Sequence, residues 1–388
     1  MKLRTPLRAA SVGALVLGLG VALTVSASAS PPRSLDWPGQ SRALFVETDA
    51  SINAVISYQQ SSDGTISYAG TYQTGGNGGT AAGASADPLA SQEGLVLANN
   101  GADLLAVNPG SDSMSVFAVN GTSLQLLQRV PSGGLFPVSI ATSGRFVAVA
   151  NAGDAGSVAE FQWFGNQLVP VPGQVRSLDF PTTGPNANTN PPDFHHSVGQ
   201  VGYSPNGQHL IITTKLTTNS YDVFSVGFNG SLGASPVVTP AVNDLPFAFT
   251  FDGAGNVVAA EAANSSVTTY HVNSNGSLTS LGTVSDGQAA LCWISGANGY
   301  YFGSNAGSQN ISSFSENSAG APVLVNAVAA TAHAGTTDSV VSPDGKFLYV
   351  ESGGAGTIDA YAIGSGGTLT QIETIFNIPV ASEGLAIS

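Results

Sequence analysis

Two adjacent histidines, His195 and His196, are the residues of this 388-residue chain best suited to chemistry near neutral pH. An imidazole ordinarily titrates near pH 6.5 and can therefore take a proton from a reacting group or give one to it. The pair ends the polar segment PTTGPNANTNPPDFHH and precedes an apolar strand-like segment. Because neighbouring side chains of an extended strand point to opposite sides, we expect only one histidine to face a ligand. The alternative is that both are polar loop residues.

Other side chains that could support such a base recur where short apolar segments begin or end. They are Glu47, Glu93, Asn108, Asn151, Lys215, Glu261, Asn305, Asp338, Glu351 and Glu383. Carboxylates can act as bases, whereas an ammonium or an amide can stabilise an oxyanion. The alternative for these residues, and for the asparagines above all, is to cap loops and to pair with free backbone groups.

These positions recur because the chain repeats one pattern seven times. Each copy is a short β-like segment that ends in an aromatic residue, and a tight turn such as Asn120-Gly121 follows nearly every copy. Repetition of a β pattern every few tens of residues is typical of propeller blades. We therefore predict an all-β, seven-bladed β-propeller. The aromatic residues are Tyr58, Phe117, Phe161, Phe224, Tyr270, Phe314 and Tyr361.

The two ends of the chain are expected to complete one blade together. Residues 383–387 (EGLAI) repeat the first-strand pattern of residues 93–97 (EGLVL), whereas the first repeat opens with a second-strand pattern, ALFVE at residues 43–47. The last strand should therefore become the innermost strand of the first blade. This closure would remove an open sheet edge, so truncation at Pro379 should be damaging.

The alternation of strands also predicts where the site lies. Beginnings of first strands and ends of second strands meet on one face of a propeller, which also carries the connections between blades. The two longest connections, residues 75–92 and 177–198, are of this kind. Long loops on a rigid scaffold often carry binding sites. We expect a small-molecule ligand on this side, called the long-loop face below.

The N-terminus predicts export. Basic residues precede an apolar run from Val12 to Val25, and a small-residue cleavage site follows, as in a secretion signal. We expect a signal peptide at 1–29, a lead-in at 30–42 and a single propeller domain at 43–388, in a secreted, extracellular or periplasmic protein. An uncleaved membrane anchor is the alternative. The single cysteine, Cys292, excludes an internal disulfide.

The charge of the chain excludes two classes of partner. The formal net charge is -14, with ten lysines and arginines in the whole sequence. Nucleic acids and anionic membranes bind clustered basic faces, which this chain cannot assemble. We therefore expect no nucleic-acid partner and no membrane contact after signal removal. No segment is typical of oligomerisation, so a monomer is expected.

The repeats resemble those of the lactonase-type seven-bladed propellers, which include bacterial 6-phosphogluconolactonase and fungal carboxymuconate cyclases. The resemblance rests on SPDGKFLYV with GTIDAYAI, SPNGQHLI with SYDVF, and GRFVAVAN with SVAEF, and it spans essentially the whole mature chain. It implies lactone opening, in which a base activates water and donors stabilise the oxyanion. The implied catalytic candidates are His195, His196, Glu261 and Glu351. The substrate-binding candidates are Glu47, Asn108, Asn151, Lys215, Asn305 and Asp338.

The expected site departs from the family in its charge. A phosphorylated or multiply carboxylated substrate calls for several cations, whereas the long-loop face offers Lys215 and at most Arg42 and Arg176. We therefore expect a hydrolase of a neutral or weakly charged lactone. The alternative is a non-catalytic extracellular propeller that binds a carbohydrate, a peptide or a protein partner.

No cofactor is predicted. Ca²⁺ could bind oxygen ligands from Glu47, Glu261, Glu351 and Glu383, but no spaced motif supports it. Zinc has less support, because there is one cysteine and no histidine pair spaced to lie on a common face.

Overall fold

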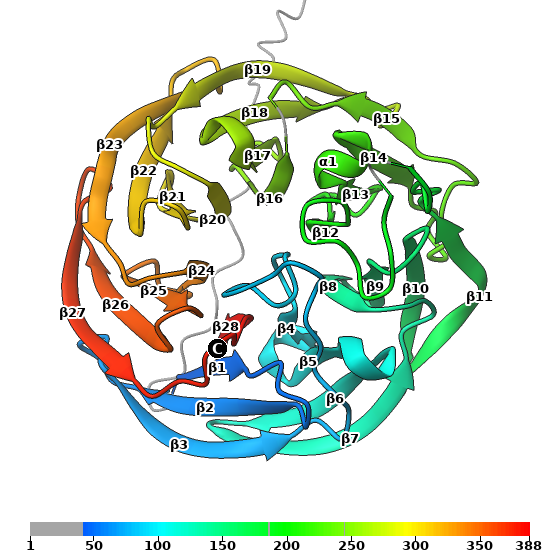
Figure 1. The fold of residues 1–388 in the computed structure, drawn as a ribbon, viewed down its shortest axis with the longest axis horizontal. Coiled ribbons are helices and arrows are strands. Elements are labelled where there is room, and N and C mark those ends of the chain that lie inside the picture. Colours follow the sequence, from blue (N-terminus) through cyan, green and yellow to red (C-terminus); the bar gives the residue numbers. More distant parts are fainter. Residues whose placement is uncertain (1–41, 185–186, 244) are drawn as a thin grey trace, which may run out of the picture. The chain divides into compact units, whose positions relative to one another are not determined.

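The computed structural model describes residues 42–184, 187–243 and 245–388. They belong to one compact unit, Gly39–Ser388, and form a ring of seven four-stranded antiparallel sheets (Figure 1). The predicted all-β, seven-bladed propeller is confirmed. The predicted signal peptide at 1–29 and nearly all of the lead-in lie outside the described residues.

Each blade is a meander that runs from the channel to the rim. From the innermost to the outermost strand the blades are β28 (Leu385–Ile387), β1 (Ala43–Glu47), β2 (Ala54–Gln60) and β3 (Ile66–Gln73); β4 (Leu95–Ala98), β5 (Asp103–Asn108), β6 (Ser113–Asn120) and β7 (Ser123–Pro131); β8 (Pro137–Ser143), β9 (Phe146–Asn151), β10 (Ser157–Phe164) and β11 (Gln167–Ser177); β12 (Gln200–Tyr203), β13 (His209–Thr213), β14 (Ser220–Ser225) and β15 (Val237–Pro240); β16 (Pro246–Phe251), β17 (Val257–Glu261), β18 (Ser266–Val272) and β19 (Leu278–Ser285); β20 (Leu291–Ala297), β21 (Tyr300–Asn305), β22 (Asn310–Glu316) and β23 (Pro322–Thr331); and β24 (Thr336–Val341), β25 (Phe347–Ser352), β26 (Thr357–Ile363) and β27 (Leu369–Phe376). One short helical turn, Asn99–Gly101, follows the first strand β4. Three others follow the second strands β5, β13 and β17: Pro109–Ser111, α1 (Lys215–Thr218) and Ala262–Asn264.

The C-terminal strand closes the ring, as the sequence predicted. β28 pairs antiparallel with β1, with Phe45 opposite Ala386, and the amide of Glu47 donates to the carbonyl of Gly384 at 3.0 Å. In Figure 1 the red β28 lies beside the blue β1 at the channel. The first blade is therefore built from both ends of the domain, which leaves β1 without a free inner edge.

The seven repeated aromatic residues are buried on the third strands. They are at most 5 % exposed and pack between neighbouring blades, as Tyr58 does with Phe347 and Tyr349. In six blades the pairing of the third and fourth strands shifts register within one or two residues of the aromatic. Such a bulge increases the local twist of a strand. The repeat thus places an interblade packing residue and a bend in the outer ladder at the same point.

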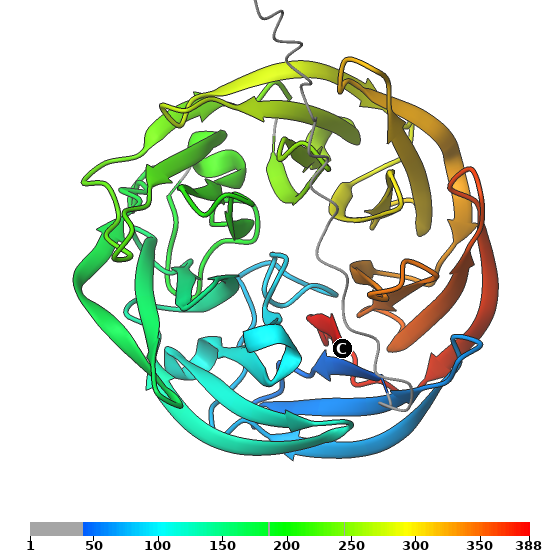
Figure 2. The same cartoon turned by 180° about the vertical axis from the view of Figure 1, so that it is seen from behind.

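The two long connections meet over the channel. Ala82 forms an isolated parallel bridge with Asp193, in which the amide of Phe194 donates to the carbonyl of Ala82 at 3.0 Å. Figures 1 and 2 show both connections extending from their blades toward the centre of the ring. The long-loop face therefore carries one joined structure rather than two separate loops. Within the described residues, no helix is long and apolar enough to span a membrane.

Candidate functional site

Residues 87–92, here called the channel segment, cross the propeller axis and are fixed to several blades. Leu89, Ala90 and Ser91 are fully buried. Trp293 Nε1 of β20 donates to the Ser91 carbonyl at 2.7 Å, while Ser91 Oγ donates to the Val138 carbonyl of β8 at 2.8 Å. Ser91 therefore connects blades on different sides of the channel. The channel segment forms a floor beneath the long-loop face.

A cavity of about 380 Å³ opens on this face, within the size range of small-molecule sites. We call it the long-loop pocket. Residues from both long connections line it, together with residues at the beginnings of β16, β20 and β24 and just after β17 and β21. This is the face on which the sequence analysis placed the candidate site. The lining is mainly apolar and includes Phe194, Leu245, Phe247 and Trp293.

Few side chains in this pocket can do chemistry. His195 and Asp87 line it together with Cys292, Thr336 and Thr337, and no lysine or arginine does so. Burial raises the pKa of the Cys292 thiol, which keeps it protonated and a weak nucleophile. The ring of Phe247 packs against Trp293 with 5.0 Å between centroids, which gives the pocket a rigid aromatic wall. His195 and Asp87 are therefore the groups able to move protons here.

The histidine pair lies in a turn, not in the extended strand that the sequence suggested. Asp193 Oδ1 accepts hydrogen bonds from the amides of His195, at 2.9 Å, and His196, at 3.2 Å, and lies 2.8 Å from His196 Nδ1. β12 begins only at Gln200. The turn directs His196 to Asp193 and leaves His195 in the pocket, where its ring meets that of Phe194 edge-on.

The protonation of His195 suits a base. Partial burial lowers the pKa of His195 below its usual value, and the nearby Lys215 and His196 lower it further, against the opposing effect of Asp193. A histidine with a lowered pKa is neutral at pH 7 and can accept a proton. Asp193 therefore has two effects. Its hydrogen bonds position the turn, and its negative charge partly offsets the lowering of the His195 pKa by desolvation.

Lys215 lies beneath the pocket rather than in its lining. It is fully buried at the start of α1, two residues after the end of β13, and has a left-handed φ of 44°. Its Nζ donates to the carbonyls of Ala90, at 2.7 Å, and Phe194, at 2.8 Å, which joins the two long connections. Burial lowers the pKa of Lys215 to about 8, although Asp87 and Glu383 favour its charged form. Lys215 thus positions the loop that carries His195.

A group of buried carboxyl side chains surrounds the channel segment. Asp87 and Glu383 face each other, and burial together with this contact raises the pKa of Glu383 well above its ordinary value. Burial also raises the pKa of Asp87. Two carboxyl groups in contact can share one proton. The group, here called the axial carboxyl cluster, comprises Glu47, Asp49, Asp87, Glu93, Asp338, Glu351 and Glu383.

Carboxyl groups of the cluster accept hydrogen bonds from backbone amides. Asp338 accepts from the amides of Ser339, at 2.7 Å, and Leu385, at 3.0 Å, while Glu383 accepts from Leu89 at 2.8 Å. Glu351 is fully buried, and neither of its carboxyl oxygens has a hydrogen-bond partner among the described residues. The same part of the chain contains no group of three or more His, Cys, Asp or Glu side chains arranged to hold a metal ion.

Several predicted site residues lie between blades and not in the pocket. Glu261 is fully buried and accepts hydrogen bonds from the hydroxyls of Tyr221, Thr268 and Tyr270 at 2.5–3.1 Å and from the amide of Asn243 at 3.1 Å. These donors come from the blade of β12–β15 (blade 4), the blade of β16–β19 (blade 5) and the connection between them. The structure therefore does not bring Glu261 to His195, and its contacts are those of a residue that joins blades.

The predicted asparagines are the last residues of second strands in other blades, as Glu261 is in its own blade. Asn108 donates to Ser115 Oγ at 2.9 Å and Asn305 donates to Ser312 Oγ at 2.8 Å, each seven residues further along the chain, the same spacing as between Glu261 and Thr268. Glu47 accepts from Asn53 at 2.7 Å, and Asn151 reaches the carbonyl of Ser132 at 3.4 Å. These side chains connect second strands to nearby elements.

Sequence reasoning missed Asp87, Phe247 and Trp293 as pocket residues and Asp193 as the residue that orders the histidine turn. Asp193 stands two and three positions before the histidines, a spacing at which aspartate commonly accepts from the backbone. Asp87 and Trp293 carry no such local signal. They meet the site only because the connection of residues 75–92 reaches the far side of the ring.

Known proteins agree with this architecture. The sequence model described as "Lactonase, 7-bladed beta-propeller" matches residues 22–163. A crystal structure of a putative 6-phosphogluconolactonase from Bacteroides fragilis is 17% identical, with a TM-score of 0.71 over 90% of this chain and 98% of that one. The periplasmic gluconolactonase of Pseudomonas aeruginosa is 19% identical, with a TM-score of 0.69 over 89% of this chain and 98% of that one. No curated protein has a significantly similar sequence.

The fold is that of a seven-bladed propeller, and residues 22–163 match the lactonase propeller model. The resemblance inferred from the repeats is confirmed. At such low identity the solved structures establish the fold of this chain and not its substrate.

Proposed function

We propose that the protein hydrolyses a neutral or weakly charged lactone in the long-loop pocket, with His195 as the general base. The observation that carries this proposal is the place of His195. It is the one imidazole among the described residues that line the mainly apolar pocket, and partial burial favours its neutral form. Asp87, in the same lining, has its pKa shifted upward. Two groups of one pocket whose pKa values are shifted in opposite directions suit a base and an acid.

In the proposed reaction a water molecule attacks the lactone carbonyl while His195 takes one of its protons. The tetrahedral intermediate then collapses, the bond between the carbonyl carbon and the ring oxygen breaks, and Asp87 protonates the departing oxygen. The product is a hydroxy acid. Proton return from the imidazolium to Asp87 through solvent restores both groups. General acid and base each contribute roughly 10²–10⁴-fold in such reactions.

The lining supports an uncharged substrate. Phe194, Phe247 and Trp293 offer apolar surface, and the absence of lysine and arginine from the lining leaves a phosphate or several carboxylates without a counter-charge. The buried Lys215 already donates to two carbonyl groups. A lactone with an alkyl or aromatic substituent therefore suits this pocket better than a phosphorylated sugar lactone.

The decisive experiment is a lactone panel assayed by pH-stat. It compares glucono-δ-lactone, an N-acyl homoserine lactone and dihydrocoumarin with 6-phosphogluconolactone. We expect hydrolysis of an uncharged lactone, and a loss of at least about 100-fold in His195→Gln. His271→Gln, which alters an exposed histidine on β18, is the matched control and should keep full activity. Equal rates for the parent and His195→Gln would refute the proposed base.

We also propose export and action as a single copy. The basic and apolar N-terminal segments support a cleaved signal, and the chain has no segment typical of oligomerisation. N-terminal sequencing of the secreted protein should find a start near Ser30. Size-exclusion chromatography with light scattering should give a monomer mass, and an intact N-terminus in the mature protein would contradict cleavage.

A further inference from the structure

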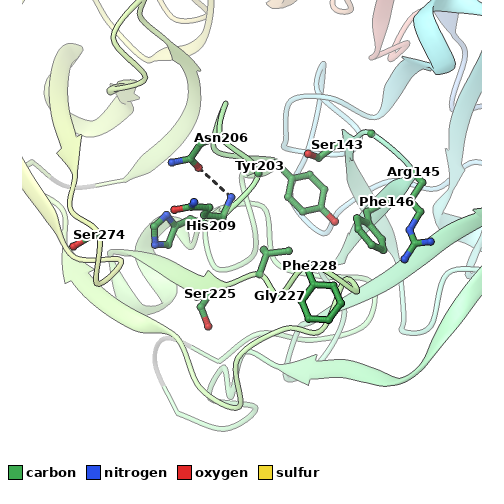
Figure 3. A pocket seen from close by; sticks show the side chains of 14 residues that line it. Ser143, Arg145, Phe146, Tyr203, Asn206, His209, Ser225, Gly227, Phe228 and Ser274 are labelled. Atoms are coloured by element: carbon green, nitrogen blue, oxygen red, sulfur yellow. Dashed lines mark hydrogen bonds between the residues drawn. The ribbon is translucent and has the colours of Figure 1, made fainter.

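A second pocket lies on the opposite face of the propeller, where the tight turns within blades gather. Its volume is about 600 Å³, and its lining comes from the β8–β9 turn, the β12–β13 turn, the β14–β15 loop and one residue of the β18–β19 turn. We call it the turn-face pocket (Figure 3). None of its lining residues lines the long-loop pocket. The lactonase proposal therefore leaves it without a role.

One lining residue, His209, departs from the pattern of the repeat. It is the first residue of β13, a position that carries an aromatic in three other blades, where a turn glycine of the next blade packs on the ring: Phe146 under Gly230, Tyr300 under Gly367 and Phe347 under Gly64. Gly276 packs near the His209 ring in the same way. A phenylalanine could make this contact, so packing does not account for an imidazole.

The polar capacity of His209 is also unused by the protein. The side chain is 5 % exposed and lines the pocket, while Nδ1 is shielded from solvent and has no hydrogen-bond partner in the described part of the chain. A buried polar atom without a partner destabilises a fold. Polar groups that a fold leaves unsatisfied in this way often belong to a ligand site.

Arg145 supplies the charge of the turn-face pocket. Its guanidinium lies over the Phe146 ring, 4.8 Å from the centroid, and no aspartate or glutamate of the described residues lines the pocket. Stacking on an aromatic ring holds the guanidinium while its N–H groups stay available for a carboxylate. In a chain with a net charge of -14, a pocket with an arginine and no acid in its lining selects for an anion.

The carboxyl group behind the pocket does not oppose an anion. Tyr203, in the lining, donates to Glu160 Oε1 at 2.6 Å, and burial raises the pKa of Glu160 to about 8. Glu160 is therefore mostly uncharged at neutral pH. Figure 3 shows the Tyr203 side chain between those of Arg145 and His209.

The rest of the lining suits a polyhydroxylated ligand. Phe228 is 97 % exposed, which is unusual for a large apolar side chain and provides a flat surface for the C–H face of a sugar ring. Hydroxyl and amide groups of Ser143, Ser225, Asn206 and Gln208 line the same pocket. We propose that the turn-face pocket binds a sugar acid, with Arg145 on the carboxylate, Phe228 against the ring and His209 on a hydroxyl group.

The test is calorimetric titration of the purified full chain with D-glucuronate, trigalacturonate and D-glucose. We expect both acids to bind and glucose to bind at least tenfold more weakly, because a charge-assisted bidentate contact is lost. Tighter binding of trigalacturonate than of glucuronate would identify the natural ligand as the end of an acidic polysaccharide. Equal binding of the two would identify it as a free sugar acid.

Four variants make the proposal falsifiable. Arg145→Met and His209→Phe should each weaken glucuronate binding about tenfold or more. His209→Phe should fold normally because three other blades carry an aromatic residue at this position. Arg129→Met, on the outer strand β7, is the control and should bind as the parent does. His195→Gln should also bind normally, which separates this site from lactone hydrolysis. The proposal is overturned if neither acid binds, if glucose binds equally well, or if Arg145→Met binds like the parent.

Discussion

The Nζ of Lys215 donates a 2.7 Å hydrogen bond to the carbonyl oxygen of Ala90, a residue 125 positions earlier in the chain. Through this bond and a second one to Phe194, a single buried ammonium holds together the channel segment and the loop that carries His195. The floor and one wall of the long-loop pocket therefore depend on one side chain that lies outside the lining.

Replacement of this ammonium should loosen both connections. In Lys215→Met two carbonyl groups lose a donor, and Asp87 and Glu383 lose a nearby positive charge, so we expect destabilisation of about 3–5 kcal/mol. Lys346→Met is the control, since Lys346 is exposed and pairs only at the surface with Asp344; its effect should stay within about 1 kcal/mol. Denaturant unfolding measures both. Equal stability of Lys215→Met and the parent would contradict the proposed role.

The stability of the domain should decrease as the pH rises from 5 to 8. Burial raises the pKa of Glu93 to about 8 and that of Asp338 to about 7, so the folded chain keeps protons that the unfolded chain has released by pH 5. Each extra proton bound by the folded state changes the unfolding free energy by about 1.4 kcal/mol per pH unit. Thermal unfolding at constant ionic strength should give a higher Tm at pH 5.5 than at pH 8. The opposite order would refute this account of the cluster.

Glu351→Gln tests the same cluster at one position. Both carboxyl oxygens of Glu351 are buried without partners in the described part of the chain, and burial raises its pKa well above the ordinary value. A neutral amide avoids burial of a charge at high pH, so the variant should be more stable than the parent at pH 8. The difference should shrink at pH 5. A variant that is less stable at pH 8 would show that the carboxylate has a stabilising partner.

Removal of residues 380–388 should abolish cooperative folding or lower the Tm by well over about 10 °C. The truncation removes β28, exposes the inner edge of β1 and deletes Glu383, which accepts from the amide of Leu89. Val380→Ser, at an exposed position outside β28, is the matched control and should unfold like the parent. Circular dichroism during heating measures the loss, and an unchanged Tm for the truncated chain would contradict closure by β28.

Glu261→Gln should separate a role between blades from a role in catalysis. Its carboxylate accepts three hydroxyl groups and one amide between blades 4 and 5, so the variant should lose about 1–3 kcal/mol of stability. The folded variant should retain its kcat/KM toward any lactone that the parent hydrolyses. A 100-fold loss of kcat with unchanged stability would instead make Glu261 catalytic.

The pH profile of hydrolysis should report the base. Because the pKa of His195 is lowered, kcat/KM should rise with pH through a pKa below 6.5 and then level off. His271→Gln should leave this acid limb unchanged. A limb centred above pH 7 would point to another group.

Much of the architecture could be predicted because its signals are local. Each repeated aromatic, such as Phe117 or Tyr361, stands a few residues before a turn, and strand alternation predicts that it points into the interface between sheets. The similarity of residues 383–387 to residues 93–97 is also a local signal, and it predicted that the last strand closes the ring. The candidate side chains were harder to assign, because Glu261 and Asn305 end second strands in the same way, and their direction depends on which hydroxyl groups the adjacent strands present.

The sequence by itself determined a seven-bladed propeller closed by its last strand, and a face that carries both long connections. Only the tertiary structure decided which residues meet there. Trp293 donates to Ser91, 202 positions away, and His195 reaches the pocket through a turn that Asp193 holds. Blade geometry follows from hydrogen bonds and side-chain alternation within about fifty residues. Contacts across the channel instead depend on the closed ring, which brings together segments that share no local pattern.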